Sequence, residues 1–365
     1  MKKISLIGST GSIGRQVIDV VGRYPDEYKI VSLVSGRGGE EFERQLARLK
    51  PEAFAVASKD EEGALRAAAY DGADIVFNAA GGFAGLSYSV AAVNAGKTLA
   101  LANKETLVCG GEEFTRLAKS RGVQILPVDS EHSAIWQCLN FNPDTKVRRL
   151  IITASGGAFR DYPFERLKEV TAEQALAHPT WKMGKKITVD SATLMNKGYE
   201  VIEAHILYGT PYGDIHTVIQ PQSIIHSMAE FSDGAVMAQM SYPTMELPIQ
   251  LALSYPERLA PAVEPMDFTR AFSLDFKPLV RESYPCFDLA LRCGEKGGTL
   301  PCVLNAADEV AVNAFLKGKI AFTDIYRVAD GTVQAIAREE VCLSGLKEVD
   351  LRARAKAEQL CAKIP

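Results

Sequence analysis

Two acidic residues separated by one serine, Asp129 and Glu131, follow an extended apolar run. Because side chains two positions apart in an extended chain point the same way, both carboxylates could bind one hard divalent cation. In a second interpretation, Asp129 or Ser130 caps a helix that begins near His132. The spacing alone favours the cap, and a third carboxylate would favour the metal.

A candidate third carboxylate lies further along the chain, in a stretch with helical periodicity. Asn196, Lys197 and Glu200 share one face of the expected helix, and Glu203 shares it too. Helical spacing does not choose between the two glutamates.

Hydrogen-bond donors that suit a phosphate monoester gather in two segments. Residues 178–197 contain four lysines and a single aspartate, and small polar residues add hydroxyl, amide and backbone donors. Lysines in a surface loop are more often solvated than functional, so the charge alone does not establish a site. The candidate donors are Ser155, Gly156, Gly157, Ser191, Asn196 and Lys197.

Trp181 and Met183 form an apolar tip in a polar loop that runs from His178 to Gly184. Such a tip is unusual for a core element and typical of a lid over a binding site. We therefore predict a lid near residues 178–186.

Three glycines, Gly8, Gly11 and Gly14, follow the first expected strand and open the first expected helix. Backbone N–H groups at a helix start, together with the positive end of the helix dipole, suit a phosphate group. The spacing differs from the G-x-G-x-x-G dinucleotide fingerprint. The alternative is a glycine turn that only packs the helix on the strand.

The end of the second expected strand carries Gly36, Arg37 and Gly38, where an NAD enzyme places an Asp or Glu for the ribose hydroxyls. An arginine without an acid suits a 2′-phosphate, so the pattern favours NADPH over NADH. Taken alone, Arg37 could equally be a solvated turn residue.

Asn103, Lys104 and Glu105 follow another expected strand. Ligands of doubly wound sheets gather beyond the carboxyl ends of the strands, which places these polar residues near a cofactor. A lone lysine there is otherwise a surface residue.

These residues need a scaffold, and the first third of the chain predicts one. Short, near-continuous apolar runs alternate there with helical patterns, which indicates an α/β fold with a doubly wound (Rossmann-type) parallel sheet. The runs are residues 29–34, 54–56, 75–77 and 98–101.

Beyond residue 123 the chain predicts a central α+β catalytic domain followed by a helical bundle. Strands are expected at residues 150–153, 186–189, 217–219 and 235–238, and helices at 194–208, 306–316 and 350–360. The predicted boundaries are 1–122 for an NADPH-binding domain, 123–255 for a catalytic, metal- and substrate-binding domain, 256–285 for a proline-rich connector and 286–365 for a C-terminal helical bundle.

The overall composition is that of an ordinary globular protein with a near-neutral charge. The 365 residues are 47% hydrophobic and carry a formal net charge of −4, so neither a basic excess nor a basic stripe favours nucleic-acid binding. No stretch is long and apolar enough to predict a signal peptide or a membrane span. Seven scattered cysteines without CxxC spacing favour reduced thiols, and we expect a cytoplasmic protein.

Several of these segments together resemble the 1-deoxy-D-xylulose 5-phosphate reductoisomerase family. The resemblance runs from the N-terminus into the helical tail, and several of the segments are long and chemically unusual. The segments that carry it are Gly8–Gly14, Leu101–Glu105, Pro127–His132, Ser155–Gly157, His178–Gly184, Val189–Gly198, Pro221–His226 and Leu304–Ala307.

The resemblance implies an enzyme of non-mevalonate isoprenoid biosynthesis. Such an enzyme rearranges and reduces 1-deoxy-D-xylulose 5-phosphate to 2-C-methyl-D-erythritol 4-phosphate with NADPH and Mg²⁺ or Mn²⁺. The family resemblance also implies a homodimer that binds a small phosphorylated sugar. The near-neutral charge and the lack of a long apolar run predict no nucleic-acid or membrane partner.

The same resemblance implies residue roles. Asp129, Glu131 and Glu200 would be the metal ligands, which decides between Glu200 and Glu203, and Lys104 would act with them in catalysis. The substrate would contact Lys104, Ser130, Glu131, Ser155, His178, Ser191, Asn196, Lys197 and Glu200, under a lid that contains Trp181 and Met183. The cofactor would contact Thr10, Gly11, Ser12, Ile13, Gly36, Arg37, Gly38, Asn103, Glu105 and Gly184.

Two other functions compete with this one. The chain could be a different NADPH dehydrogenase with a similar two-domain plan, or a catalytically silent NADPH-binding regulator. A simple dehydrogenase has no need of a metal site, and a silent protein could lose its carboxylates, so the three acidic residues weigh against both.

Overall fold

The structure is a computed structural model in which residues 1–142 and 144–364 are described. It divides into two compact units. The first comprises residues 1–107, 112–133 and 244–265, and the second comprises residues 108–111, 134–243 and 266–365.

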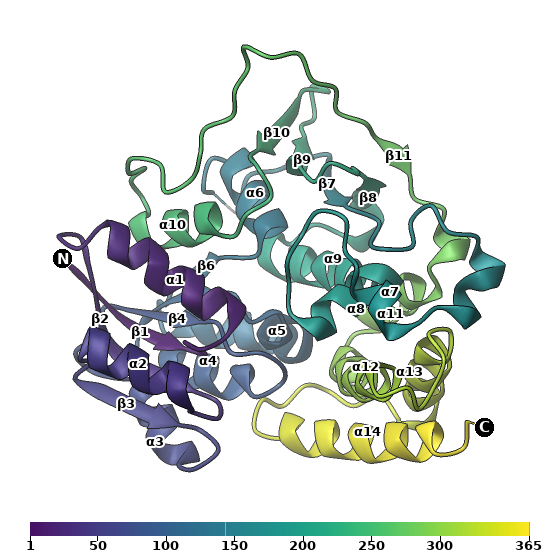
Figure 1. Cartoon of the computed structure of the whole chain (residues 1–365), viewed down its shortest axis with the longest axis horizontal. Coiled ribbons are helices and arrows are strands. Elements are labelled where there is room, and N and C mark those ends of the chain that lie inside the picture. The colour runs from purple at the N-terminus through teal and green to yellow at the C-terminus, as the bar shows by residue number, and fades with distance from the viewer. Residues whose placement is uncertain (143, 365) are drawn as a thin grey trace. The chain divides into compact units, whose positions relative to one another are not determined.

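A six-stranded parallel sheet organises the first unit, in the order β3-β2-β1-β4-β5-β6 (Figure 1). The central strands are apolar almost throughout because both faces of the sheet are covered, and Ile4, Leu6 and Ile7 of β1 are fully buried. The strands are β1 (Lys2–Ile7), β2 (Tyr28–Ser35), β3 (Ala53–Val56), β4 (Ile75–Asn78), β5 (Thr98–Leu101) and β6 (Ile125–Pro127). The predicted doubly wound α/β fold is confirmed.

Helices connect and cover these strands. α3 and α4 pack against each other and against the sheet, and α1 packs on α10 from much later in the chain. The helices are α1 (Ser12–Arg23), α2 (Glu40–Leu49), α3 (Glu61–Ala68), α4 (Gly85–Asn94), α5 (Lys104–Ser120) and α10 (Glu246–Ser254). Because the strand order reverses between β1 and β4, loops diverge there and leave room for a ligand.

Residues 244–265 join the first unit through contacts with its N-terminal segment. Lys2 Nζ donates hydrogen bonds of 2.9 Å to the carbonyl oxygens of Leu253 and Tyr255, and Arg23 pairs with Glu246 at 2.9 Å. The prediction of a domain boundary at residue 255 rests on the prolines that follow it. Proline content gives no information on contacts between residues so far apart in the sequence. The three-domain division stays a prediction.

The second unit contains a mixed five-stranded sheet in the order β10-β9-β7-β8-β11. Only β7 and β8 pair in parallel. The strands are β7 (Arg149–Ala154), β8 (Ile215–Ile219), β9 (Ile225–Glu230), β10 (Val236–Met240) and β11 (Lys277–Pro278).

Helices and connecting loops form the rest of the second unit, and α12, α13 and α14 pack side by side (Figure 1). A common apolar core joins α8, α9, α11 and α12. The helices are α7 (Ala172–Leu176), α8 (Lys185–Thr193), α9 (Met195–Tyr208), α11 (Pro285–Lys296), α12 (Leu300–Leu316), α13 (Asp324–Ala335) and α14 (Leu346–Cys361), while α6 (Ser130–Cys138) begins in the first unit and ends in the second. No helix in the described residues is long and apolar enough to cross a membrane.

One expected strand is wrong. Residues 186–189 lie in α8, although Ile187, Thr188 and Val189 are β-branched. Thr188 satisfies its hydroxyl by donating to Gly184 O one turn back, at 2.8 Å, and residues from Thr188 onward are buried on all sides. Tertiary burial therefore overrides the local preference for a strand.

Candidate functional site

The glycine segment after β1 packs too closely for any side chain at two of its positions. Gly8 has a φ of +79°, and a Cβ there would lie 2.4 Å from Ala79 O. A Cβ on Gly14 would lie 2.2 Å from Gly8 O. No side chain caps the first turn of α1, so the loop brings backbone N–H groups to the strand edge where a pyrophosphate can approach.

The end of β2 is tied to this glycine segment. Ser35 Oγ lies 3.1 Å from Thr10 Oγ1 and accepts a 3.1 Å hydrogen bond from Gly38 N–H. Arg37 is exposed beside them. The structure thus places the predicted contacts Thr10, Gly36, Arg37 and Gly38 at the carboxyl ends of two adjacent strands.

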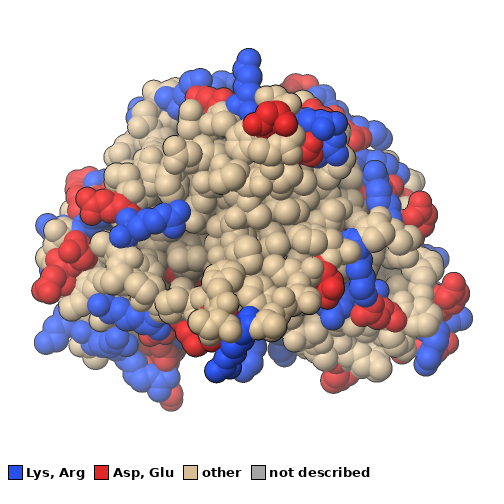
Figure 2. All heavy atoms as spheres, turned by 90° about the horizontal axis from the view of Figure 1, so that it is seen from above, with Lys and Arg blue, Asp and Glu red and all other residues tan. Residues whose placement is uncertain are grey.

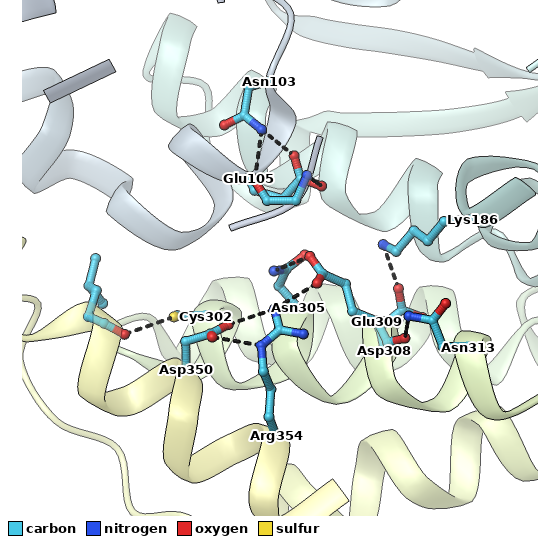
Figure 3. Close-up of polar contacts among 12 residues, drawn as sticks. Asn103, Glu105, Lys186, Cys302, Asn305, Asp308, Glu309, Asn313, Asp350 and Arg354 are labelled. Atoms are coloured by element: carbon cyan, nitrogen blue, oxygen red, sulfur yellow. Dashed lines mark hydrogen bonds and ion pairs between the residues drawn. The ribbon is translucent and has the colours of Figure 1, made fainter. Parts of the chain in front are cut away.

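Asn103 and Glu105 fix the loop that follows β4. Asn103 caps α5 by accepting a 3.0 Å hydrogen bond from Thr106 N–H, and its Nδ2 donates to Ala80 O at 2.9 Å and to Glu105 at 2.7 Å (Figure 3). Glu105 accepts from Gly82 N–H at 3.2 Å. Both side chains therefore shape the edge of the sheet at its switch point.

Lys104 and Asp129 form an ion pair beyond the ends of β5 and β6. Both side chains are largely buried, with 12% and 21% of their surfaces exposed. Ser130 Oγ donates a 2.6 Å hydrogen bond to Glu131. The first unit therefore brings together Lys104, Asp129, Ser130 and Glu131, whereas Glu200 belongs to the second unit.

In the second unit, α9 presents a buried carboxylate with two donors. Glu200 is 1% exposed, accepts a 2.5 Å hydrogen bond from Asn196 Nδ2 and forms an ion pair with Lys197. The three residues share one helical face, as their spacing predicted. Glu203 is also buried, at 3% exposure, so burial does not separate the two glutamates.

A loop and a helix of the second unit bring Ser155 and Ser191 to neighbouring positions. A Cβ on Gly157 would lie 2.5 Å from Ser191 O, so only glycine permits this approach. Gly157 also has a φ of +68°, a left-handed conformation that favours glycine. α8 ends in the left-handed residue Leu194, which starts α9 and its donors Asn196 and Lys197.

His178 bonds to Ser155 in a defined tautomer. Its Nδ1 accepts hydrogen bonds from the N–H groups of Thr180 and Trp181, at 3.2 and 2.9 Å, so in neutral histidine the proton resides on Nε2. Nε2 lies 2.9 Å from Ser155 Oγ and donates to it, as does Gly157 N–H at 3.1 Å. With two donors on its oxygen, Ser155 can donate its own O–H to a ligand.

Burial, reinforced by the nearby charge of Arg160, lowers the pKa of His178 to about 4. Because an unfolded histidine titrates near pH 6.5, the unfolded chain binds a proton at pH 5 that the folded chain does not. Stability should therefore fall as pH decreases from 6.5 toward 4, by about 1–2 kcal/mol at pH 5 from this group.

Urea denaturation at pH 7.5 and pH 5 tests this prediction. The wild type should lose about 1–2 kcal/mol more stability on acidification than His178→Gln does. The four other histidines are the same in both proteins and cancel in the comparison. Equal losses would show that His178 titrates normally in the folded protein.

The predicted lid loop connects α7 to α8. Trp181 is half-buried and meets His226 edge to face, with ring centroids 6.1 Å apart, and His226 Nε2 lies 3.0 Å from Ser241 Oγ. Met183 is also half-buried. Gly184, a predicted cofactor contact, precedes α8 in the second unit, whereas the other predicted cofactor contacts lie in the first.

Sequence reasoning missed Arg160. Its Nη1 donates to Ser155 O at 3.1 Å and to Pro221 O at 3.2 Å. Arg160 therefore fixes the backbone of the Ser155–Gly157 loop through the Ser155 carbonyl group. An arginine five positions beyond a serine carries no recognisable signal, because the contact depends on how the loop folds back.

Comparison with known proteins covers nearly the whole chain. The sequence model described as 1-deoxy-D-xylulose 5-phosphate reductoisomerase matches residues 4–69 and 57–111. The models of the reductoisomerase C-terminal domains match residues 125–208 and 240–356. The reductoisomerase of Acaryochloris marina is 47% identical over 96% of this chain and 92% of its own, and that of Crocosphaera subtropica is 48% identical over 97% and 95%.

Solved structures agree with the sequence matches. The reductoisomerase of Zymomonas mobilis in complex with NADPH superposes with a TM-score of 0.90 at 36% identity, over 100% of both chains. A DOX-P reductoisomerase in complex with NADPH, fosmidomycin and magnesium gives a TM-score of 0.92 at 34% identity, over 99% of this chain and 98% of that one. The chain therefore belongs to the 1-deoxy-D-xylulose 5-phosphate reductoisomerase family.

Proposed function

We propose that this protein converts 1-deoxy-D-xylulose 5-phosphate to 2-C-methyl-D-erythritol 4-phosphate with NADPH and a divalent metal ion. The observation that carries the proposal is the family match across both units at close to half identity. Two features of the structure support the proposal: the glycine segment at the carboxyl edge of the parallel sheet in one unit, and the group of hydroxyl, amide and ammonium donors around Ser155, Ser191 and Asn196 in the other. Relatives of known structure are complexes with NADPH and with magnesium.

We assign the metal to Asp129, Glu131 and Glu200. Carboxylate oxygens are the ligands that Mg²⁺ and Mn²⁺ prefer, and the ammonium groups of Lys104 and Lys197 already lie against two of the three. These carboxylates are therefore placed to stabilise positive charge. When bound, the ion supplies Lewis-acid polarisation of the ketone and hydroxyl oxygens of the substrate.

The remaining assigned residues bind and orient the substrate. Ser155, Ser191, Asn196 and Lys197 donate to its phosphate, and His178 fixes the orientation of Ser155. Lys104 balances negative charge near the reacting carbons or passes a proton. Binding of the remote phosphate provides energy to close the loop of Trp181 and Met183 and to exclude water.

A spectrophotometric assay tests the function. Oxidation of NADPH, followed at 340 nm, should require both 1-deoxy-D-xylulose 5-phosphate and Mg²⁺ or Mn²⁺, and EDTA should abolish it. Comparing the two ions at equal concentration determines which one the protein prefers. Turnover that persists in EDTA would contradict the metal assignment, and no turnover with either ion would contradict the function.

Arg37→Ala should raise the KM for NADPH about 10- to 100-fold and leave the KM for NADH nearly unchanged. A hydrogen bond to a charged group contributes about 1.5–3 kcal/mol, and only NADPH carries the 2′-phosphate that Arg37 would contact. Steady-state kinetics with both cofactors measure the effect. Arg44→Ala, which removes another exposed arginine, is the control, and equal effects on both cofactors would exclude the 2′-phosphate contact.

We further propose that the protein is a cytoplasmic homodimer that pairs through β10. This strand ends the second sheet, and its Val236 and Met237 are 49% and 55% exposed. The face seen from the β10 side carries few charged side chains at its centre (Figure 2). An exposed apolar edge strand favours pairing with another chain, which supports the dimer. All seven cysteines are thiols, as is usual in reducing compartments, which supports the cytoplasm.

Met237→Lys should weaken the dimer at least about tenfold, because it places a charge in the proposed interface. Sedimentation equilibrium measures the dissociation constant. Phe54→Lys is the matched control, since Phe54 is a 60% exposed apolar residue on β3, the edge strand of the other sheet. A monomeric wild type, or equal weakening by both variants, would contradict an interface at β10.

A further inference from the structure

A charged cluster built on two buried aspartates joins α8 to α12 in the second unit. Lys186 Nζ lies 2.7 Å from Asp190 and 2.7 Å from Asp308, the contact drawn in Figure 3. The aspartates are 2% and 0% exposed, and the same ammonium lies 5.3 Å from the centre of the Tyr199 ring. None of these residues has a role in the function proposed above.

The cluster contains one positive charge for two carboxyl groups. Burial, and then the negative charge of Asp308, raises the pKa of Asp190 well above its usual value. A protonated carboxyl can donate a hydrogen bond to its neighbour and leaves the group of three neutral, which a buried site requires. Two further ionisable groups, Tyr199 and Cys286, interact electrostatically with both aspartates. Tyr199 interacts in turn with Cys109 and with Glu309, which is paired with Arg354 at 2.6 Å.

The position of the cluster in the chain links it to the phosphate donors. Asp190 directly precedes Ser191, whose carbonyl lies against Gly157 of the Ser155 loop. Lys186 lies two residues beyond Gly184, where the lid loop ends and α8 begins. Any shift of α8 along α12 would therefore move both serines and one end of the lid.

We propose that Lys186, Asp190 and Asp308 are positioning residues that anchor α8 on α12 and thereby set the geometry of Ser155 and Ser191. This inference rests on the proposed function of that phosphate site. The anchor holds the start of α8, where the predicted lid loop ends, on α12 of the C-terminal helices. In this way α12 would contribute to substrate binding without touching the substrate.

Kinetics of Asp308 variants test the anchor. Asp308→Ala should raise the KM for 1-deoxy-D-xylulose 5-phosphate about 10- to 100-fold, since misplacement of binding groups by about 1 Å has effects of that size. Its kcat and its KM for NADPH should stay within about threefold of the wild type. Asp308→Asn should keep the substrate KM within about threefold of the wild type, because its amide can donate a hydrogen bond to Asp190 and so keep the two side chains in contact.

Asp350→Ala is the matched control. Asp350 is a buried aspartate of α14, 5% exposed, that pairs with Arg354 at 2.7 Å, so its loss should lower stability without changing the substrate KM. Equal increases in the substrate KM in Asp308→Ala and Asp350→Ala would mean that general destabilisation causes the effect, and would contradict the anchor. An unchanged KM in Asp308→Ala would also contradict it. The same holds if Asp308→Asn is as impaired as Asp308→Ala.

Two further measurements keep the outcomes separate. If Asp308→Ala does not fold, Lys186→Met takes its place, because Lys186 is 28% exposed, and the same selective rise in KM is expected. Calorimetric titration with inorganic phosphate should show weaker binding to the same variants. A wild type without turnover contradicts the proposed function, whereas normal turnover with unaltered KM and phosphate binding in the variants contradicts only the anchor.

Discussion

Glu200→Gln is expected to lower kcat/KM for 1-deoxy-D-xylulose 5-phosphate about 10³-fold or more. The substitution keeps the length of the side chain and an oxygen that can accept from Asn196, but it removes the charge that would bind the ion. Lewis-acid stabilisation by a metal contributes several kcal/mol, and each 1.36 kcal/mol corresponds to a tenfold change in rate. NADPH oxidation across a series of Mn²⁺ concentrations, with Mn²⁺ binding measured by calorimetry, gives the result.

Glu203→Gln is the matched control, because Glu203 lies one turn further along α9 and is similarly buried. It should bind Mn²⁺ with nearly the affinity of the wild type and retain turnover to within about tenfold. The reverse pattern, with metal binding lost only in Glu203→Gln, would transfer the ligand role from Glu200 to Glu203.

The sequence predicted well those features that depend on neighbouring residues. The runs around β1, β2, β4 and β5 are apolar because both faces of the parallel sheet are covered, so the fold class follows directly from composition and alternation. The face of α9 that carries Asn196, Lys197 and Glu200 follows from helical geometry alone. The structure confirms both features.

Sequence patterns could not predict the features that depend on contacts between residues far apart in the chain. The β-branched residues Ile187 and Val189 favour a strand locally, yet burial among α9, α11 and α12 makes the segment helical. Arg160 acquires its partners only when the Ser155 loop folds back, and Asp308 reaches Lys186 from more than a hundred residues away. Local propensity and motif spacing contain no information on such pairs.

The predicted metal ligands Asp129, Glu131 and Glu200 were selected by the family resemblance and not by residue spacing. Spacing alone favoured a helix cap at Asp129 or Ser130 and left Glu200 and Glu203 equivalent. In the structure, Asp129 forms an ion pair with Lys104. Its carboxylate therefore interacts with a charged side chain, which a helix-capping role alone does not require. The Glu200→Gln and Glu203→Gln variants, one turn of α9 apart, separate the two candidate ligands.

Lys104→Met should lower kcat about 10²- to 10³-fold while NADPH affinity, measured by fluorescence titration, stays close to that of the wild type. Lys104 begins α5 with its ammonium held by Asp129, so the charge is fixed before substrate arrives. A preorganised charge near a developing anion contributes about 3–4 kcal/mol to transition-state stabilisation. Methionine retains the packing of the aliphatic stem and removes only the charge.

Mn²⁺ affinity separates this role from metal binding. Removing an ammonium beside Asp129 leaves a more negative site, so Lys104→Met should bind Mn²⁺ at least as tightly as the wild type even though turnover falls. Lys119→Met, at the exposed far end of α5 beyond its kink at Gly111, should match the wild type in every respect. A parallel loss of Mn²⁺ affinity and turnover in Lys104→Met would mean that Lys104 serves to orient Asp129, and its direct role in catalysis would be excluded.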